Sequence, residues 1–494
     1  MEITLKIFQF ILSISILVGL HELGHFIPAR IFKTRIEKFF LFFDPWFSLF
    51  AIKKIQGKWR YKFFAKNQPV TKKVIENGKE AEVPIDLNSL PDDDWRKSPE
   101  NTKYGIGWLP LGGYVKIAGM VDESMNLEQL KKPAKPWEFR SKPAWQRLII
   151  MMGGVTVNFF LAWVIYSGLS YLQGESYIDL RKFTDGISTT EAAKKMGFRN
   201  GDKILAIDGK PVKSLDKALI NIFFGKEVAV ERTGEIKKIK IDDEGILAVM
   251  KQNEAKRYLF PRLPLIVDST TESAKAAGLK KGDRIVSIDG VKIQFSDEAF
   301  PILKKNSGKR IPLRIKRGED EISVAAPVDK EGRLGIFYIY KKSLENVTTT
   351  EKYSLPASIP RGLERTIGAL TMQLKQFKII FNTKLQGYKS VGGPIAIVGA
   401  MPVKKGHQGE LSVDWAFFWG FTAMFSVWLA FLNLLPIPGL DGGHVMFTLW
   451  EIVTGKPVPQ KVLENAQTIG VLFLMGLMLL IFGNDLFKIM AKHF

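Results

Sequence analysis

The sequence predicts a multi-domain polytopic membrane protein that combines a four-span α-helical membrane core with two tandem α+β domains. The chain of 494 residues is longer than most single domains. Four long stretches carry almost no charged side chains, and each is long enough to form a membrane helix. A segment of 17 residues also recurs 81 positions later, which indicates two copies of one small domain.

The composition excludes several classes of function. Cysteine is absent, so disulfides, thiolate metal sites and cysteine nucleophiles are excluded. The formal net charge is +21, which we attribute to membrane topology and to attraction toward anionic lipid. The sequence has no recognisable nucleic-acid-binding module, so we expect membrane lipid and no nucleic acid among its partners.

The apolar stretches define the expected membrane helices, because about 20 apolar residues are enough for a helix to cross a bilayer. We place these helices at 1–30, 147–174, 413–440 and 465–489. The first could be mistaken for a signal peptide. However, its apolar part runs on to Ala29, and a small-x-small cleavage site does not follow.

Basic residues between the first two helices set the expected orientation. Arg30 and Lys33 follow the first helix, and Arg140 and Arg147 lie at the start of the second. Because cytoplasmic loops carry an excess of Lys and Arg, we expect the 31–146 loop to be cytoplasmic. The N-terminus and the large region between the second and third helices are then outside, and the short loop 441–464 is inside.

The connecting segments contain further patterns. Residues 105–119 alternate and are rich in glycine, which predicts a membrane-associated β-hairpin. The long stretch 43–103 has no assignable role, and we expect a solvated loop. Within the linker 341–412, apolar residues recur at helical spacing from 363 to 388, interleaved with basic ones. This predicts an amphipathic helix on the outer membrane surface, with a helix packed on the second small domain as the alternative.

The repeated segment has the signals of one small α+β domain. Nine of 17 positions are identical between residues 193–209 and 274–290. Each copy reads as a short helix, a Gly-Asp turn, and a strand that runs into an Asp-Gly turn. We place the two domains at 176–262 and 263–340.

This repeat resembles the PDZ domain in its bacterial arrangement. PDZ domains bind an extended peptide at the edge of a sheet. Leu334, Gly335 and Ile336 resemble the loop that receives a peptide carboxylate, so peptide C-termini outside the membrane are candidate partners. Residues 258–261 of the first copy read Tyr-Leu-Phe-Pro and depart from that pattern. Two domains that act as spacers or steric screens are the alternative.

The first expected helix contains a metal-binding pattern. His21, Glu22 and His25 fit H-E-x-x-H. On a helix the two imidazoles share one face and can bind one Zn²⁺, with the glutamate beside them as general base. Three polar side chains inside an apolar span are costly unless they are paired, coordinated or hydrated. A structural polar cluster between helices is the alternative.

A catalytic zinc needs a third protein ligand and an open position for water. Asp441, at the end of the third span, is the best candidate. Pro436 and Pro438 break the helix there, and a carboxylate at membrane depth is favourable beside a cation. A helix cap is the alternative role of Asp441, and His444 is the alternative ligand.

Together these patterns resemble the site-2 protease family of intramembrane metalloproteases. H-E-x-x-H lies in the first span, and N-x-x-P-x-P-x-L-D-G runs from Asn433 to Gly442. The two PDZ-like copies between the second and third spans resemble the bacterial branch, the regulator of sigma-E protease type. Residues 112–117, Gly-Gly-Tyr-Val-Lys-Ile, also resemble a family segment.

The resemblance implies roles for individual residues. It implies a zinc site made by His21, His25 and Asp441. Glu22 would activate water, and Asn433 resembles an asparagine implicated in substrate handling, although an asparagine that only packs between helices is the alternative. A strand of the substrate would pair with a β-loop that includes Gly113, Tyr114 and Val115.

The leading hypothesis is therefore an intramembrane zinc endopeptidase that cleaves transmembrane segments of single-span membrane proteins in regulated intramembrane proteolysis. The resemblance implies anti-sigma factors or remnant signal peptides as substrates. It also implies a multi-pass protein of the cell inner membrane with periplasmic PDZ-like domains. A catalytically silent membrane adaptor and a divalent-metal transporter are the alternatives.

Overall fold

The computed structural model describes the chain in two compact units, each considered by itself below. The described residues are 1–68, 71–76, 79–110, 112–120, 133–251, 257–338, 340–382, 384–385, 392–405 and 410–493. The first unit comprises Met1–Gln173, Tyr353–Phe377 and Tyr388–Phe494. The second unit comprises Gly174–Lys352 and Lys378–Gly387.

Four helices of the first unit are long and apolar enough to cross a membrane. They are α1 (Glu2–Ile31), α3 (Ala144–Leu172), α12 (Trp415–Leu434) and α14 (Gln460–His493). The third is shorter than its predicted range of 413–440, because Pro436 and Pro438 cannot donate backbone hydrogen bonds to a continuing helix. The segment 441–464, expected as a loop, begins with a further helix, α13 (Asp441–Thr454).

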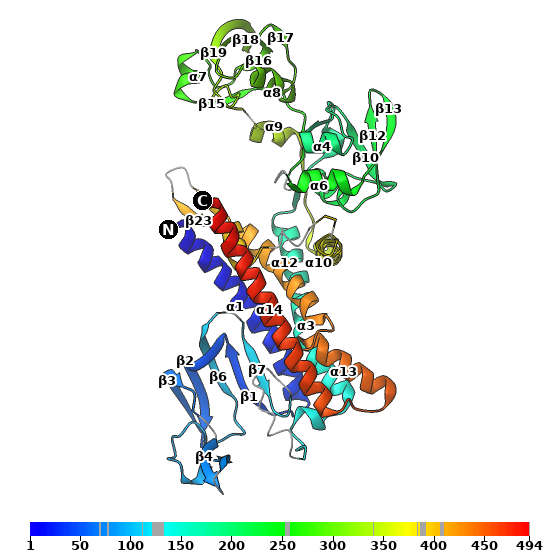
Figure 1. Ribbon diagram of the computed structural model, residues 1–494. Coiled ribbons are helices and arrows are strands. Elements are labelled where there is room, and N and C mark those ends of the chain that lie inside the picture. Colours follow the sequence, from blue (N-terminus) through cyan, green and yellow to red (C-terminus); the bar gives the residue numbers. More distant parts are fainter. Residues whose placement is uncertain are drawn as a thin grey trace. The chain divides into compact units, whose positions relative to one another are not determined.

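Helices α1 and α3 approach each other closely, and α12 also packs against α3 (Figure 1). The contact of α1 with α3 requires glycine on both sides. A Cβ atom at Gly24 would lie 2.4 Å from the Gly153 carbonyl oxygen, and one at Gly153 would lie 2.0 Å from the Gly24 oxygen. Small residues of this kind let helix backbones approach in a membrane. The Ser426 hydroxyl of α12 donates to the Asn158 carbonyl of α3 at 2.7 Å.

Helix α10 (Leu355–Ile380) begins eight residues before the predicted amphipathic segment, 363–388, and ends at Ile380, so it covers the first part of that segment. Residues 383 and 386–388 lie outside the described residues. Its buried residues are all small or polar: Ser358, Gly362, Thr366 and Gln373. Trp163 of α3 donates to the Ile359 carbonyl at 2.8 Å, so this part of α10 packs on a membrane helix. The apolar residues Ile367 and Leu374 are exposed. The location of α10 on the outer membrane surface stays a prediction.

A buried acid fixes the short helix α11 (Pro394–Ala400) to α14. Asp485 of α14 is 3% exposed. Its carboxylate accepts hydrogen bonds from the backbone amides of Gly393 at 2.9 Å, Ile395 at 3.1 Å and Ala396 at 3.3 Å. These amides lie at the start of α11 and have no partner within that helix, so Asp485 caps it.

A five-stranded sheet lies beside α1 in the first unit (Figure 1). Its strands are β1 (Ile36–Leu41), β2 (Phe43–Ile55), β3 (Lys58–Lys66), β6 (Lys103–Leu109) and β7 (Tyr114–Ile117), in the order β3-β2-β6-β1-β7. The prediction of a hairpin at 105–119 was wrong, because β6 and β7 each pair with β1, which lies between them. Leu111, which lies in this segment, is outside the described residues.

The stretch 43–103 is not the solvated loop that we expected. Strands β2 and β3 within it supply two strands of the sheet. Farther on, β4 (Thr71–Glu76) pairs with β5 (Lys79–Pro84), and a 3₁₀ turn, η1, covers Leu87–Ser89. This part of the chain therefore supplies strands of the five-stranded sheet and, separately, the two-stranded sheet β4-β5.

The second unit contains the two repeated segments, and each has its own core. The first copy contains β9 (Ile187–Thr189), α4 (Glu191–Lys195), β10 (Lys203–Ile207), β11 (Lys210–Pro211), α5 (Leu215–Ile222), β12 (Glu227–Arg232), β13 (Glu235–Lys240), α6 (Asp243–Lys251) and β14 (Leu259–Pro261). The second contains β15 (Val267–Thr270), α7 (Glu272–Ala276), β16 (Arg284–Ile288), β17 (Val291–Lys292), α8 (Ser296–Lys305), β18 (Arg310–Arg317), β19 (Asp320–Pro327) and β20 (Ile336–Tyr338).

Both copies form the same pairings. A four-stranded sheet has the order β11-β10-β12-β13 in the first and β17-β16-β18-β19 in the second. A buried ion pair also recurs: Asp202 binds Arg232 and Asp283 binds Arg317, each at 2.7 Å. The structure thus repeats where the sequence repeats, and the PDZ resemblance stays a prediction. The pair β8 (Glu175–Ile178) and β21 (Thr348–Glu351) joins the two ends of this unit, and α9 covers Tyr340–Val347.

Candidate metal centre

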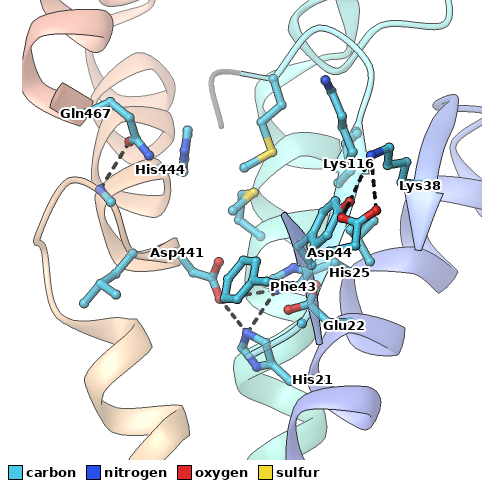
Figure 2. Close-up of a pocket in the computed structure, with 18 of the residues that line it drawn as sticks. His21, Glu22, His25, Lys38, Phe43, Asp44, Lys116, Asp441, His444 and Gln467 are labelled. Carbon is cyan, nitrogen blue, oxygen red and sulfur yellow. Dashed lines mark hydrogen bonds and ion pairs between the residues drawn. The ribbon is translucent and has the colours of Figure 1, made fainter. Parts of the chain in front are cut away.

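Three side chains converge at the centre of the first unit (Figure 2). His21 and His25 lie one turn apart on α1, and both are buried. Asp441 is the first residue of α13. The Asp441 Oδ2 atom lies 3.2 Å from His21 Nε2 and 3.3 Å from His25 Nε2, and the two Nε2 atoms are 3.3 Å apart. The three atoms therefore form an almost equilateral triangle.

This triangle fits a tetrahedral zinc ion. Zinc binds histidine nitrogen and carboxylate oxygen at about 2.0–2.1 Å, so two ligand atoms of one tetrahedral ion lie about 3.3–3.4 Å apart. The three measured separations agree with that spacing. Two imidazoles and one carboxylate also leave the fourth position of a tetrahedral ion for water or substrate.

The distal nitrogen of each imidazole has a partner on α3. His25 Nδ1 lies 2.8 Å from the Ile150 carbonyl oxygen, which can only accept, so Nδ1 carries the proton and the Nε2 lone pair is available to a metal. His21 Nδ1 lies 3.1 Å from the Asn158 amide. Asn158 Oδ1 is buried and has no hydrogen-bond partner among the described residues. A half-turn of this amide would let Oδ1 accept from a protonated Nδ1.

Gly154 of α3 leaves the space in which the two imidazoles lie. A Cβ atom at this position would lie 2.4 Å from His25 Nε2 and 2.6 Å from His21 Cε1. Contacts this short do not occur between real atoms, so a larger residue would displace the rings. The close approach of α3 therefore both supports and shapes the metal-binding face of α1.

Glu22 lies beside the triangle (Figure 2), and it lines the same cavity as residues of strand β7. Val115 of this strand is among them. Strand β7 is the last in the order of the sheet, so one of its edges has no partner strand among the described residues.

Asn433 and the break after α12 complete the centre. The Asn433 amide nitrogen lies 3.2 Å from His21 Nε2. α12 ends one residue later, and the chain turns through Pro436 and Pro438 before Asp441. Gln467 of α14 accepts from the Gly439 amide at 3.2 Å and fixes this turn.

A cavity of about 580 Å³ opens beside these residues. Helical residues, including Glu22, Asp441 and His444, line one side of it. Residues of the sheet line the other side, including Lys38, Asp44, Gly113, Tyr114 and Val115. The cavity thus places the edge of a sheet opposite a metal-binding triangle.

The structure brings together most of the predicted site residues. Those in the cavity or at its metal-binding end are His21, Glu22, His25, Gly113, Tyr114, Val115, Asn433 and Asp441. The other three belong to the second unit. There Leu334 is buried in the core, the Gly335 carbonyl accepts from the Thr271 amide at 2.8 Å, and Ile336 pairs with Thr270.

The sequence analysis missed Gly154, Asn158 and Asp44. A Gly-Gly pair and an asparagine inside the uncharged second span are signals that could have indicated the first two, because both are unusual choices for a helix surface that faces lipid. Asp44 lies in the stretch that we expected to be a solvated loop.

The class of protein follows from this arrangement: a group of side chains that could hold a metal ion and that includes H-E-x-x-H, in a protein whose described residues contain four helices able to span a membrane, is typical of a membrane-bound metalloprotease. The sequence pattern of peptidase family M50 matches residues 9–65 and 93–477. The chain therefore belongs to this family and is a zinc metalloprotease. The family does not favour a catalytically silent adaptor.

Similar proteins agree with this assignment over almost the whole chain. A protein of Neisseria meningitidis named as a zinc metalloprotease is 27% identical, and the match covers 98% of this chain and 99% of the relative. The regulator of sigma E protease of Haemophilus influenzae is 25% identical over 97% and 98% of the two chains. Protease RseP of Yersinia pestis is 25% identical over 98% and 99%. The protein is thus a site-2 protease of the RseP type.

Proposed function

We propose that this protease cleaves transmembrane segments of single-span membrane proteins, such as anti-sigma factors or remnant signal peptides, in regulated intramembrane proteolysis. The observation that carries the proposal is the metal-binding triangle on α1 and α13, which faces the free edge of β7 across one cavity. This arrangement supplies a hydrolytic centre and a place for an extended peptide side by side.

Individual residues have distinct roles in this proposal. His21, His25 and Asp441 hold the zinc ion. Bound zinc would lower the pKa of a water molecule and polarise the scissile carbonyl. Glu22 accepts the proton of the attacking water at its carboxylate and then transfers it to the leaving amine. The Asn433 amide, 3.2 Å from His21 Nε2, is close enough to the centre to donate to the carbonyl oxygen or to an unwound substrate backbone.

The free edge of β7 is the proposed docking site for the substrate backbone. A helix in lipid keeps its carbonyls within its own hydrogen bonds, so it must unwind before it is cut. An unwound segment could pair with Gly113, Tyr114 and Val115 by strand addition. The unwound backbone would then lie beside Glu22 in the cavity.

We also propose that the second unit restricts the access of substrates to the metal centre from outside the membrane. In this topology the N-terminus and both PDZ-like domains are on the periplasmic side of the cell inner membrane. Leu334, Gly335 and Ile336 would receive a peptide C-terminus. Basic residues that flank the first two membrane helices support this orientation.

The decisive test is Glu22→Gln in the full-length protein, with a model transmembrane peptide as substrate. Zinc content should stay at about one ion per chain, because Glu22 is not among the proposed ligands. Cleavage should fall by at least about 100-fold, since general-base catalysis contributes on the order of 10²–10⁴.

Glu2→Gln makes the same chemical change on the same helix and is the matched control. Glu2 lies in the first turn of α1 and pairs with Lys6 at 3.2 Å, so cleavage should be unchanged. Undiminished cleavage by Glu22→Gln would overturn the proposal.

A further inference from the structure

Three residues of the sheet form a polar group in the wall of the cavity, here called the Asp44 cluster: Lys38, Asp44 and Tyr114. The Tyr114 hydroxyl donates to Asp44 Oδ1 at 2.6 Å, and the Lys38 ammonium donates to the Tyr114 hydroxyl at 3.2 Å. The Tyr114 ring stacks with Phe40 and Phe43, at centroid distances of 5.6 and 6.0 Å. The position of the hydroxyl is thus fixed by the aromatic rings.

The corner between β1 and β2 holds Asp44 in place. Phe42 and Trp46, two residues to either side, have φ angles of +71° and +68°, a conformation that is costly for residues with a side chain. The Asn67 amide donates to the Asp44 carbonyl at 2.6 Å. Asp44 is 5% exposed, so its side chain is buried in the corner between β1 and β2.

One oxygen of this carboxylate is left without a hydrogen bond. Asp44 Oδ2 is buried, and the described residues provide no hydrogen-bond partner for it. It lies 3.7 Å from the Lys38 ammonium, which is beyond hydrogen-bond distance. Lys38, Asp44 and Tyr114 all line the cavity that contains Glu22. A buried polar atom without a partner destabilises the protein, so a ligand that donates to it would gain affinity.

The charges around this oxygen balance one another. Asp44 faces Lys38, and the neighbouring Lys116 pairs with Glu37 at 3.7 Å. Burial, and then the charge of Lys116, lower the pKa of Lys38. A charged ligand would upset this balance, and an apolar one would leave Oδ2 without a hydrogen-bond donor. A neutral group with both a donor and an acceptor, an amide or a hydroxyl, matches the cluster.

The register of β7 directs alternate side chains of a paired peptide toward this cluster. Tyr114 and Lys116 lie on one face of β7 and are opposite Phe40 and Lys38 of β1. Side chains of a peptide strand beside β7 would alternate in the same way. Every second residue would therefore reach the face of the sheet that bears the cluster.

We propose that the Asp44 cluster is a specificity site that selects substrates with an amide or hydroxyl side chain (Asn, Gln, Ser or Thr) near the cleaved bond. This inference rests on the proposed function, since it concerns the peptide that would pair with β7. It predicts that the enzyme prefers membrane segments that carry one neutral polar residue at a fixed distance from the cut.

The test measures binding of two transmembrane peptides to the Glu22→Gln protein in detergent. The peptides are identical except that one carries Asn and the other Leu at a single position, which is moved stepwise along the segment. At one register the Asn peptide should bind about 10-fold more tightly, the affinity ratio expected for one buried hydrogen bond to a charged group. Equal affinity at every register would overturn the inference.

A second variant tests whether the Asp44 cluster causes the preference for the Asn peptide. Asp44→Leu combined with Lys38→Met removes both charges together, which avoids an unpaired buried ion. In the Glu22→Gln background the preference for Asn should disappear, while zinc content stays the same. Asp94→Asn, which alters an acid paired with Arg96 at 2.8 Å away from the cavity, should keep the preference. A preference that persists in the double variant would also overturn the inference.

Cleavage of the same peptides by the unmodified protein separates this inference from the proposed function. If neither peptide is cut, the proposed substrate class fails, while the binding ratio still decides the role of the cluster. If both are cut at rates that differ as their affinities do, both proposals stand.

Discussion

The two walls of the cavity are built in different ways. On the helical wall, helices meet at glycine contacts of 2.0–2.4 Å for a hypothetical Cβ, and each imidazole is fixed by a single polar partner on α3. On the sheet wall, charges and aromatic rings balance one another around Asp44. We infer that the helical wall fixes one geometry around an ion, whereas the sheet wall offers a binding surface. Substitutions on the first should therefore act through zinc, and those on the second should leave zinc in place.

Gly154→Ala should have the largest effect and tests the helical wall most directly. The new Cβ would lie 2.4 Å from His25 Nε2, so the imidazoles would have to move. We expect loss of tightly bound zinc by metal analysis, and cleavage reduced by at least about 100-fold. Gly168→Ala on the same helix is the control, because a Cβ there meets nothing within 4 Å. Full zinc occupancy in Gly154→Ala would contradict the inference that the helical wall fixes the geometry around the ion.

Asn158→Ala should have an intermediate effect, because it removes the polar partner of His21 on α3. Loss of the partner of His21 Nδ1 should weaken zinc binding by about 10–100-fold, as for other residues that orient a metal-binding histidine. Asn158→Asp keeps an oxygen that can accept from Nδ1 and should retain more zinc than the alanine variant. Competition with a chelator measures both affinities. If both variants lost the same zinc affinity, an oxygen that accepts from His21 Nδ1 would not contribute to zinc binding.

Lys103→Met, on the sheet, should have the smallest effect and should not act through zinc. The Lys103 ammonium lies over the rings of Phe40 and Trp95, and burial, with the nearby charge of Lys38, lowers its pKa to about 8. The unfolded chain, with the ordinary value of about 10.5, binds this proton more tightly. The charged lysine therefore destabilises the fold below about pH 8, and this cost fades as the pH rises to about 10.5.

Lys103→Met should consequently raise the Tm at pH 7, and the gain should shrink toward pH 10.5. Lys58→Met, at an exposed position of β3, is the control and should change little. Thermal unfolding across this pH range, with zinc content measured in parallel, checks the expectation. If the gain in Tm grew with pH, the charge of buried Lys103 would not be its cause.

The sequence was sufficient for the family, the zinc dependence and the four membrane helices, and these predictions are confirmed. Each depends on a local pattern: H-E-x-x-H places two imidazoles one turn apart on one face of a helix, and a long uncharged stretch is sufficient to form a membrane helix. The structure also brings Asp441 to the two histidines, as the interrupted third span suggested. The catalytic and substrate-binding roles of individual residues stay predictions.

The sheet and its contribution to the site could not be predicted in this way. Strand β1 lies between β6 and β7, and such an order depends on pairings between distant segments that no local pattern encodes. Asp44 lies in the cavity wall together with Tyr114, which is 70 residues later in the chain and donates to its carboxylate. Gly154 and Asn158 likewise matter because α3 packs on α1, a contact that an apolar stretch alone does not specify.

The cap that Asp485 provides for α11 bears on how charge inside the membrane should be interpreted. An acidic residue within a spanning helix usually suggests a route for ions or protons. Here its two oxygens are already engaged by three backbone amides. Asp485 therefore has a structural role, because it attaches α11 to α14. Among the described parts of α14, its charge does not indicate a pathway for ions or protons.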